Sequence, residues 1–197
     1  TIAVHRDPRD RTAEDRPVTP AGIYVLERRV LDYIPSTGFQ DVKEGLIPRL
    51  YRAGERVIMH AADSVCPRVL NTQTYLAVNH WMVRRIADNP AGFEHWAACG
   101  ASGEAVIHPT ARIDRGALLI GPVLVGPRVT IMSGAIIVGP TTIGADSVVR
   151  QAALVSRSVL WARCLVEEEA MVDRSVLADD AIVDASLGLS FTEIKNA

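Results

Sequence analysis

His108 is the side chain of this 197-residue sequence whose type and position best suit a general base. It stands in a His-Pro pair at the start of a repetitive stretch, where a histidine could deprotonate a hydroxyl or an amine. The same pair is also common as a simple corner of the backbone, and the repeats contain no second histidine. The other histidines lack the spacing of a zinc site, and the cysteines form no CxxC pair. A structural role for His108 is therefore the favoured interpretation.

Branched aliphatic residues recur at every sixth position through the repetitive stretch: Ile107, Ile113, Leu119, Val125, Ile131, Ile137, Ile143, Val149 and Val155. A small or compact residue follows four positions after each of the first eight: Ala111, Ala117, Val123, Val129, Ala135, Thr141, Ser147 and Ala153. Neither the 3.6-residue period of a helix nor the two-residue period of a strand gives this spacing. A hexapeptide coil does, because three short strands close one triangular turn. The sequence therefore predicts a left-handed parallel β-helix with a terminal cap over residues 104–197.

The repeat is interpreted as looser beyond Val155. Leu160, Val166 and Val172 are again six apart, but the charged run Glu167-Glu168-Glu169 intrudes and is predicted to be a solvated corner. The tail from Gly188 is expected to end the coil with polar and helical character. Gly-Pro pairs at 121–122, 126–127 and 139–140 are predicted to form corners, because Gly and Pro favour turns.

Residues 1–103 are predicted to form an α/β region together with a helix that links it to the repeats. Strands are expected at 21–26 and 56–60, and helices at 27–34, 41–53 and 72–87. Residues 1–20 are interpreted as a loop, and 89–92 should break the last helix. Three aromatic residues near that helix could form a partner-binding patch, but packing of the helix against the β-helix is the favoured interpretation: Trp81, Phe93 and Trp96.

The composition limits the classes of partner. A net charge of −2 and a hydrophobic content of 48% indicate a soluble globular chain, with no nucleic acid and no anionic membrane surface as partner. No apolar run is long enough to span a membrane, and the N-terminus has no signal-peptide pattern. With three cysteines and no disulfide framework, a cytoplasmic location is expected.

The order of these elements resembles the C-terminal half of sugar-1-phosphate nucleotidyltransferases, particularly the mannose-1-phosphate guanylyltransferase-like group. The resemblance covers about residues 16–190. It rests on six short segments that are similar to family segments in the same order: Ala21–Leu26, Phe39–Val42, Leu46–Leu50, Gly54–Val57, Tyr75–Asn79 and Val106–Ala111.

This resemblance implies formation of an NDP-sugar from a nucleoside triphosphate and a sugar 1-phosphate. The family opens with a Gly-rich, Arg-containing loop that grips the triphosphate. No such loop occurs here, and the nearest glycine pair, in Gly100-Ala101-Ser102-Gly103, precedes the coil. The chain is therefore expected to begin midway through the catalytic domain and to be inactive alone.

The family also carries a W-x-D-x-G-T-like turn whose Asp is similar to a magnesium ligand. Alignment on Tyr75 places Arg68 at that position, within the segment 66–71. A guanidinium cannot coordinate Mg²⁺, which takes oxygen ligands, although it could contact a phosphate directly. A surface cation in a degenerate loop is the alternative.

Gly22, Tyr24 and Asp41 are the residues that the resemblance implies for the sugar side of the site. Gly22 could let a sugar ring approach the backbone, or could serve strand packing. Tyr24 fits a core position better than a ligand contact. Asp41 could hold a sugar hydroxyl or a metal ion, but an N-cap of the following helix is the favoured interpretation.

Three hypotheses follow. The chain is the C-terminal part of a nucleotidyltransferase that binds a sugar 1-phosphate or an NDP-sugar once its site is completed. The runner-up is a non-catalytic regulatory or scaffold subunit that pairs with an active nucleotidyltransferase. The third is a hexapeptide acyltransferase that uses His108. In each case the β-helix is expected to mediate a homo-oligomer or hetero-oligomer.

Overall fold

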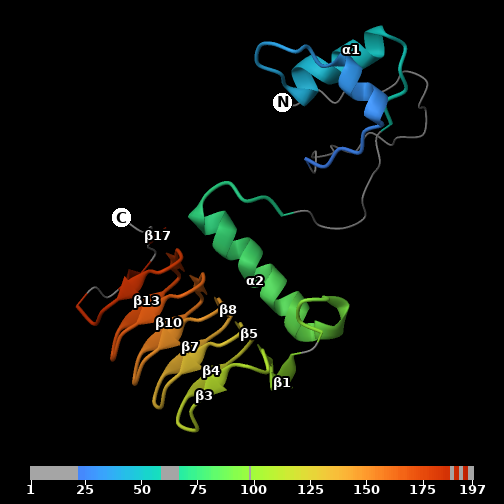
Figure 1. The fold of residues 1–197 in the computed structure, drawn as a ribbon. Helices are drawn as coiled ribbons and strands as arrows, with labels where there is room; N and C mark the ends of the chain where they lie inside the picture. The colour runs from blue at the N-terminus through green and yellow to red at the C-terminus, as the bar shows by residue number, and fades with distance from the viewer. Residues whose placement is uncertain (1–21, 59–66, 98, 187–188, 191–192, 195–197) are drawn as a thin grey trace. The chain divides into compact units, whose positions relative to one another are not determined.

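The computed structural model describes residues 22–58, 67–97, 99–186, 189–190 and 193–194 (Figure 1). The chain forms two compact units, residues 1–66 and residues 67–197. The long helix before the repeats therefore shares a unit with the β-helix. The domain boundary at residue 103 stays a prediction, because it separates two expected domain types and not two compact units.

The described part of the first unit is helical. It contains η1 (Arg28–Tyr33), η2 (Val42–Leu46) and α1 (Ile47–Arg52), and Gly54 with φ +73° ends the last of these. The helices predicted at 27–34 and 41–53 are thus confirmed in outline.

The two strands predicted in this unit are wrong for the residues described. Residues 22–26 and 56–58 form no strand, and Ile23 and Val25 are 76% and 96% exposed. An apolar run becomes a buried strand only where neighbouring strands pair with it and a second layer covers it. The described part of this unit offers neither.

The second unit is the predicted left-handed parallel β-helix, built from three flat sheets (Figure 1). We call the sheets faces A, B and C. Face A contains β2 (Ala105–Ile107), β5 (Val123–Val125), β8 (Thr141–Ile143), β11 (Val159–Leu160), β14 (Val176–Leu177) and β17 (Glu193–Ile194). Face B contains β3 (Arg112–Ile113), β6 (Thr130–Ile131), β9 (Val148–Val149), β12 (Leu165–Val166) and β15 (Ile182–Val183). Face C contains β4 (Leu118–Ile120), β7 (Ile136–Val138), β10 (Leu154–Ser156), β13 (Met171–Asp173) and β16 (Leu189–Ser190).

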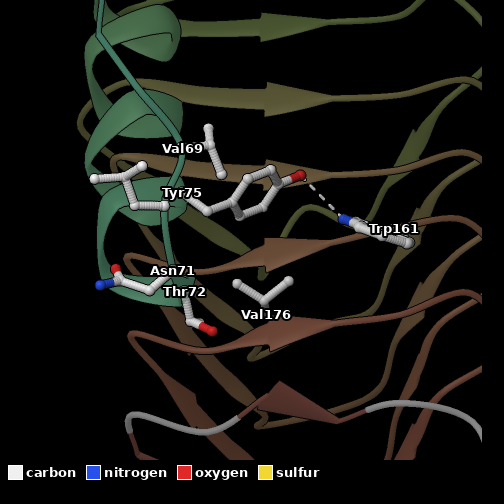
Figure 2. Close-up of a pocket in the computed structure, with 7 residues that line it drawn as sticks. Val69, Asn71, Thr72, Tyr75, Trp161 and Val176 are labelled. Carbon is white, nitrogen blue, oxygen red and sulfur yellow. Dashed lines mark hydrogen bonds between the residues drawn. The ribbon is translucent and has the colours of Figure 1, made fainter. Parts of the chain in front are cut away.

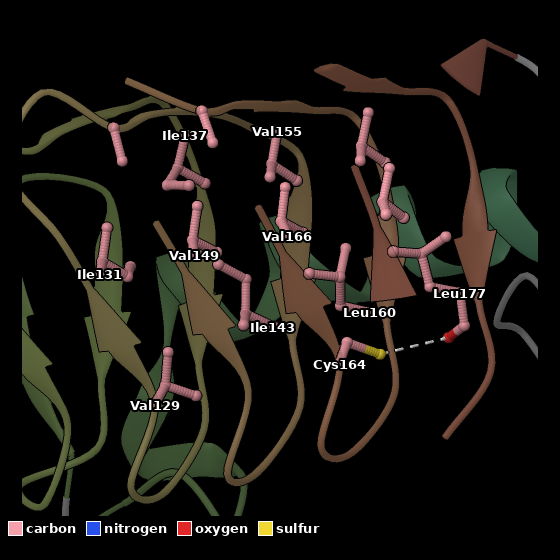
Figure 3. Close-up of a cluster of buried hydrophobic side chains, with 14 of the residues drawn as sticks. Val129, Ile131, Ile137, Ile143, Val149, Val155, Leu160, Cys164, Val166 and Leu177 are labelled. Carbon is pink, nitrogen blue, oxygen red and sulfur yellow. Dashed lines mark hydrogen bonds between the residues drawn. The ribbon is translucent and has the colours of Figure 1, made fainter. Parts of the chain in front are cut away.

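One strand from each face makes one coil, so that coil 1 is β2, β3 and β4, and coils 2 to 5 follow in order. The aliphatic residue of each hexad points inward and stacks on its counterparts in the coils above and below (Figure 3). Ile131, Ile137, Ile143, Val149 and Val155 are all 0% exposed. The interior is thus a continuous apolar column, as the spacing of six predicts.

The repeat does not loosen beyond Val155 but shortens. Val125 pairs with Ile143, 18 residues later, whereas Ile143 pairs with Leu160 and Leu160 with Leu177, each 17 residues later. One residue is lost at the corner between faces C and A. The coil also continues beyond Gly188, since Leu189–Ser190 and Glu193–Ile194 still pair as strands.

Buried hydroxyls explain how this shorter corner is built. Thr141, Ser158 and Ser175 stack at it and are 0% exposed. Each hydroxyl donates to a carbonyl of its own coil, and the backbone N–H groups of Ser158 and Ser175 donate to the hydroxyl one coil earlier. Each of these three buried hydroxyls therefore has a hydrogen-bond partner within the protein, as buried hydroxyls require.

Helix α2 (Thr72–Asp88) lies along face A. Asn71 and Thr74 form a capping box at its start, because each side chain accepts a hydrogen bond from the other's backbone N–H. The helix was predicted over 72–87, and η3 (Pro90–Gly92) follows it as the expected break.

The contact between α2 and face A is made by residues spaced three or four apart. Val83 and Ile86 pack against Val106 and Leu124, and Leu76 packs against Val159 and Val176 in a second cluster. Phe93 and Trp96 pack against the first cluster as predicted, whereas Trp81 stacks under the guanidinium of Arg85.

A short antiparallel hairpin precedes coil 1. Strand β1 (Gly100–Ser102) pairs with β2 on face A. The predicted C-terminal cap falls mainly on residues outside those described. No helix in the described part of the chain is both long and apolar enough to cross a membrane.

Candidate functional site

Three of the residues predicted for the sugar side lie in the first unit. Asp41 is the N-cap of η2, because its Oδ1 accepts hydrogen bonds from the backbone N–H groups of Lys43 and Glu44 at 2.7 and 2.8 Å. Tyr24 is 42% exposed and is therefore not a core residue. Gly22 has φ +78° and open space where a Cβ would stand. The cap is thus confirmed, and the sugar contacts stay predictions.

Arg68 belongs to the second unit and is exposed on the segment before α2. Its guanidinium has no oxygen to offer, so this position does not fit a magnesium ion. The described residues also contain no group of three or more His, Cys, Asp or Glu side chains that could hold a metal ion. We therefore derive no metal-dependent step for this site.

A pocket of about 470 Å³ lies beside Arg68's segment, between the start of α2 and the β-helix (Figure 2). Residues 69–72 and Tyr75 form one side of it, and Trp161 and Val176 form the other. The indole Nε1 of Trp161 donates a hydrogen bond of 3.1 Å to the hydroxyl of Tyr75. This bond ties α2 to the corner of coil 4.

The lining of the pocket suits binding rather than acid–base catalysis. Val69, Leu70 and Trp161 are 55%, 72% and 45% exposed, so that the pocket presents apolar side chains to solvent. None of the lining residues is Asp, Glu, His, Cys, Lys or Arg. The pocket is therefore a candidate docking surface for an apolar group.

One feature of the sequence that was not used in the predictions marks this pocket. Trp161 takes the register position held by Gly126 and Gly144 in the two preceding coils. A Cβ at Gly144 would collide with the carbonyl oxygen of Trp161, so that this row needs glycine below the tryptophan. The large aromatic residue that follows two glycines in this row forms part of the pocket wall.

His108 is held in a local turn at the first corner. Its Nδ1 accepts a hydrogen bond from the backbone N–H of Thr110 at 3.2 Å and lies 2.9 Å from the Thr110 hydroxyl. That hydroxyl in turn accepts the backbone N–H of Arg128 in the next coil. This geometry is that of a corner, and it supports the structural interpretation.

Charged residues at the corner between faces A and B alternate from coil to coil. Arg128 of coil 2 pairs with Asp146 of coil 3, and Arg163 of coil 4 pairs with Asp180 of coil 5. All four have positive φ, between 57° and 63°, as the corner demands. The hydrogen bond from Arg163 lowers the pKa of Asp180, and the bond from Arg128 likewise lowers the pKa of Asp146. These pairs fasten successive coils together.

Fold and pocket together define a class of protein: a parallel β-helix with a helix packed along one face and a pocket at its side. Within this class, residues 101–194 match the model of the GMPPB C-terminal domain family.

A curated relative supports the assignment. The chain is 34% identical over 106 residues to the protein named mannose-1-phosphate guanylyltransferase of Mycobacterium tuberculosis. That stretch is 53% of this chain and 28% of the relative, so that the chain spans little more than a quarter of the relative's length. The resemblance to the C-terminal half of such enzymes, predicted from the sequence, is confirmed.

Proposed function

We propose that this chain is the C-terminal part of a sugar-1-phosphate nucleotidyltransferase of the guanylyltransferase type. Such an enzyme joins a nucleoside triphosphate to a sugar 1-phosphate and releases pyrophosphate. The match of residues 101–194 to the GMPPB C-terminal domain carries the proposal, and the named activity of the relative agrees with it. In this role the β-helix is an assembly module, and the chemistry belongs to the nucleotidyltransferase domain.

The first unit would supply the sugar-side wall, with Gly22, Tyr24 and Asp41, and Arg68 would contact phosphate. Large apolar residues of this unit are exposed, with Val25 at 96% and Phe39 at 93%. Exposed aliphatic and aromatic side chains of this size usually mark a surface that another part of a protein covers. We therefore expect the unit to become catalytically competent only when further polypeptide completes the domain.

A non-catalytic regulatory or scaffold subunit is the second candidate, and Arg68 at the carboxylate position favours it. A subunit that cannot hold the metal ion could still bind an active nucleotidyltransferase. The acyltransferase hypothesis gains nothing from the structure, because Nδ1 of His108 is engaged in its own turn.

A turnover assay tests the proposal. The purified chain is incubated with GTP, mannose 1-phosphate and Mg²⁺, and pyrophosphate release is measured against a heat-denatured control. We expect no release from the chain alone, and release when a nucleotide-binding N-terminal portion from the mycobacterial relative is added. Turnover by the chain alone would refute the incomplete-domain account.

The same mixture separates the alternatives. A regulatory subunit would leave the N-terminal portion inactive but would copurify with an intact guanylyltransferase and change its kcat/KM. Acyl transfer from a CoA thioester that is lost in His108→Ala would instead support the third hypothesis.

A further inference from the structure

Face C of the β-helix carries one outward row of side chains that is apolar over four coils. Its two outward rows come from alternate residues of each strand. The first row is Leu118, Ile136, Leu154 and Met171, and the second is Ile120, Val138, Ser156 and Asp173. Leu118, Ile120 and Met171 are 55%, 52% and 51% exposed. The first row therefore forms an uninterrupted apolar stripe along the axis of the β-helix.

No helix of the second unit's described residues covers this stripe. Helix α2 contacts β2, β5 and β8, which all belong to face A (Figure 1). Face B is more polar, since its outward rows include Arg112, Asp114, Arg150 and Glu167. Face C is thus the apolar sheet surface that this unit leaves without a layer of its own.

The corner next to the stripe carries opposite charges at its two ends. Arg115, Ser133, Gln151 and Glu168 occupy the same register position in coils 1 to 4. All four are exposed, and no ion pair within the described part of the chain involves Arg115 or Glu168. The row therefore reads basic, neutral, neutral, acidic along the axis.

We propose that face C binds face C of a second copy of this chain, with the two β-helix axes antiparallel. A two-fold axis parallel to the strands, between coils 2 and 3, places coil 1 of one copy on coil 4 of the other. Leu118 then meets Met171 and Ile136 meets Leu154, so that the stripe covers itself. The same rotation places Arg115 opposite Glu168 twice.

A parallel arrangement fits less well. It would place the first row against the second row, so that Ser156 and Asp173 would face Leu154 and Met171. In the antiparallel arrangement the first row meets only itself, and the second row meets itself with Asp173 opposite Ile120. Asp173 already binds Arg157 and Arg174, so that neither arginine of that corner needs a partner from another copy. The antiparallel arrangement instead pairs Arg115 with Glu168 of the other copy.

The expected contact is modest in size. With strands about 4.8 Å apart, four coils give a face roughly 20 Å on a side, about half of the roughly 800 Å² per partner of a standard interface. The association should therefore depend on concentration in the micromolar range. The proposal deepens the assembly role given to the β-helix above, and it does not depend on the catalytic part of that proposal.

Sedimentation velocity of the full chain over a concentration series tests the face. Leu118→Glu should weaken association at least tenfold. Ile182→Glu is the matched control, because Ile182 is 60% exposed on face B and should leave association unchanged. Circular dichroism melts of both variants would show that the fold is kept. A monomeric wild-type chain at 100 μM, taken as roughly the upper end of the expected range, or unchanged association of Leu118→Glu, would overturn the proposal.

Charge reversal tests the orientation. Arg115→Glu and Glu168→Arg should each weaken the dimer several-fold, and the double variant should restore it, because each pair is rebuilt with its signs exchanged. Both side chains are exposed, so that neither single change should affect folding. Failure of the double variant to recover would overturn the antiparallel arrangement. Loss of association with retained turnover in the mixed assay would separate this proposal from the catalytic one.

Discussion

Faces A and C of the β-helix have the same backbone and the same alternation of side chains, yet they meet different surroundings. On face A the outward residues Val106 and Leu124 are 1% and 3% exposed, because α2 lies on them. On face C the outward residues Leu118 and Ile120 are more than half exposed. The hexad pattern fixes what points inward, whereas the covering of an outward apolar row depends on an element elsewhere in the chain or on another chain.

The same substitution on the two faces should have very different costs. Leu124 and Ile136 both point outward in coil 2, on faces A and C. Leu124→Glu forces a carboxylate beneath α2 and should cost about 3 kcal/mol or more, while Ile136→Glu should cost about 1 kcal/mol or less. Urea denaturation at a dilution that keeps the chain monomeric measures both.

A conservative substitution at Leu124 serves as the control for this comparison. Leu124→Met keeps the apolar volume on face A and should cost less than about 1.5 kcal/mol. If Leu124→Glu and Ile136→Glu destabilise the monomer equally, α2 does not seal face A in solution.

The side chains of Thr142 and Asn79, which form a polar contact in the α2 interface, should show strong energetic coupling. Thr142 donates a hydrogen bond of 2.9 Å to Oδ1 of Asn79, whose Nδ2 is buried without a partner. Thr142→Val should cost about 1–2 kcal/mol, because it leaves the whole amide unpaired, whereas Thr142→Val with Asn79→Leu should be nearly neutral. A double-mutant cycle in urea gives the coupling energy, and purely additive effects would show that the contact is not formed.

Cys164 should make stability fall at alkaline pH. Burial raises the pKa of its thiol to about 11. The unfolded thiol, with a pKa near 8.5, loses its proton first, so that the unfolded state binds fewer protons between these values. The stability contribution is therefore complete below about pH 8 and is lost as the pH rises toward 11.

The matched variant for this test is Cys164→Ala, since Ala181 fills the same corner one coil later. The difference in unfolding free energy between wild type and variant should stay constant below pH about 8 and decline above pH about 9. A difference that is flat up to pH 11 would mean that the thiol is not buried as described.

The smallest expected effect concerns the ion pairs between coils. The hydrogen bond from Arg163 lowers the pKa of Asp180, so that the pair's contribution is present above the ordinary Asp pKa and is lost as the pH falls through the lowered value. Asp180→Asn should lower the melting temperature slightly at pH 7 and not at pH 2, and high salt should shrink the difference. Melting curves at both pH values measure this, and a larger difference in acid would contradict the pairing.

The interior of the β-helix could be predicted because a buried triangular coil demands an aliphatic residue at each sixth position. The prediction of a looser repeat beyond Val155 was wrong, because the coil there stays regular but is one residue shorter. Ser158 occupies there the corner position that Thr141 holds one coil earlier, and its hydroxyl accommodates the shorter corner. A rule based on constant spacing cannot predict the loss of one residue. The structure, by contrast, keeps Leu160 and Leu177 in line with Ile143.

The first unit and the pocket were less predictable for physical reasons. The run 22–26 has the composition of a buried strand, but composition does not state whether partner strands are present. The pocket depends on the start of α2 meeting Trp161, two places 86 residues apart that no local pattern links. Asp41 was predictable as a cap because its bonds reach only the next few residues.

Hydroxyl-radical footprinting over a concentration series tests the contrast between the faces most directly. Met171 lies in the apolar row of face C and is 51% exposed, while Met132 follows β6 at the edge of face B and serves as an internal reference. We expect oxidation of Met171 to slow as the chain is concentrated into the micromolar range, while oxidation of Met132 stays constant. Equal rates for Met171 at every concentration, or protection of Met132 instead, would contradict it.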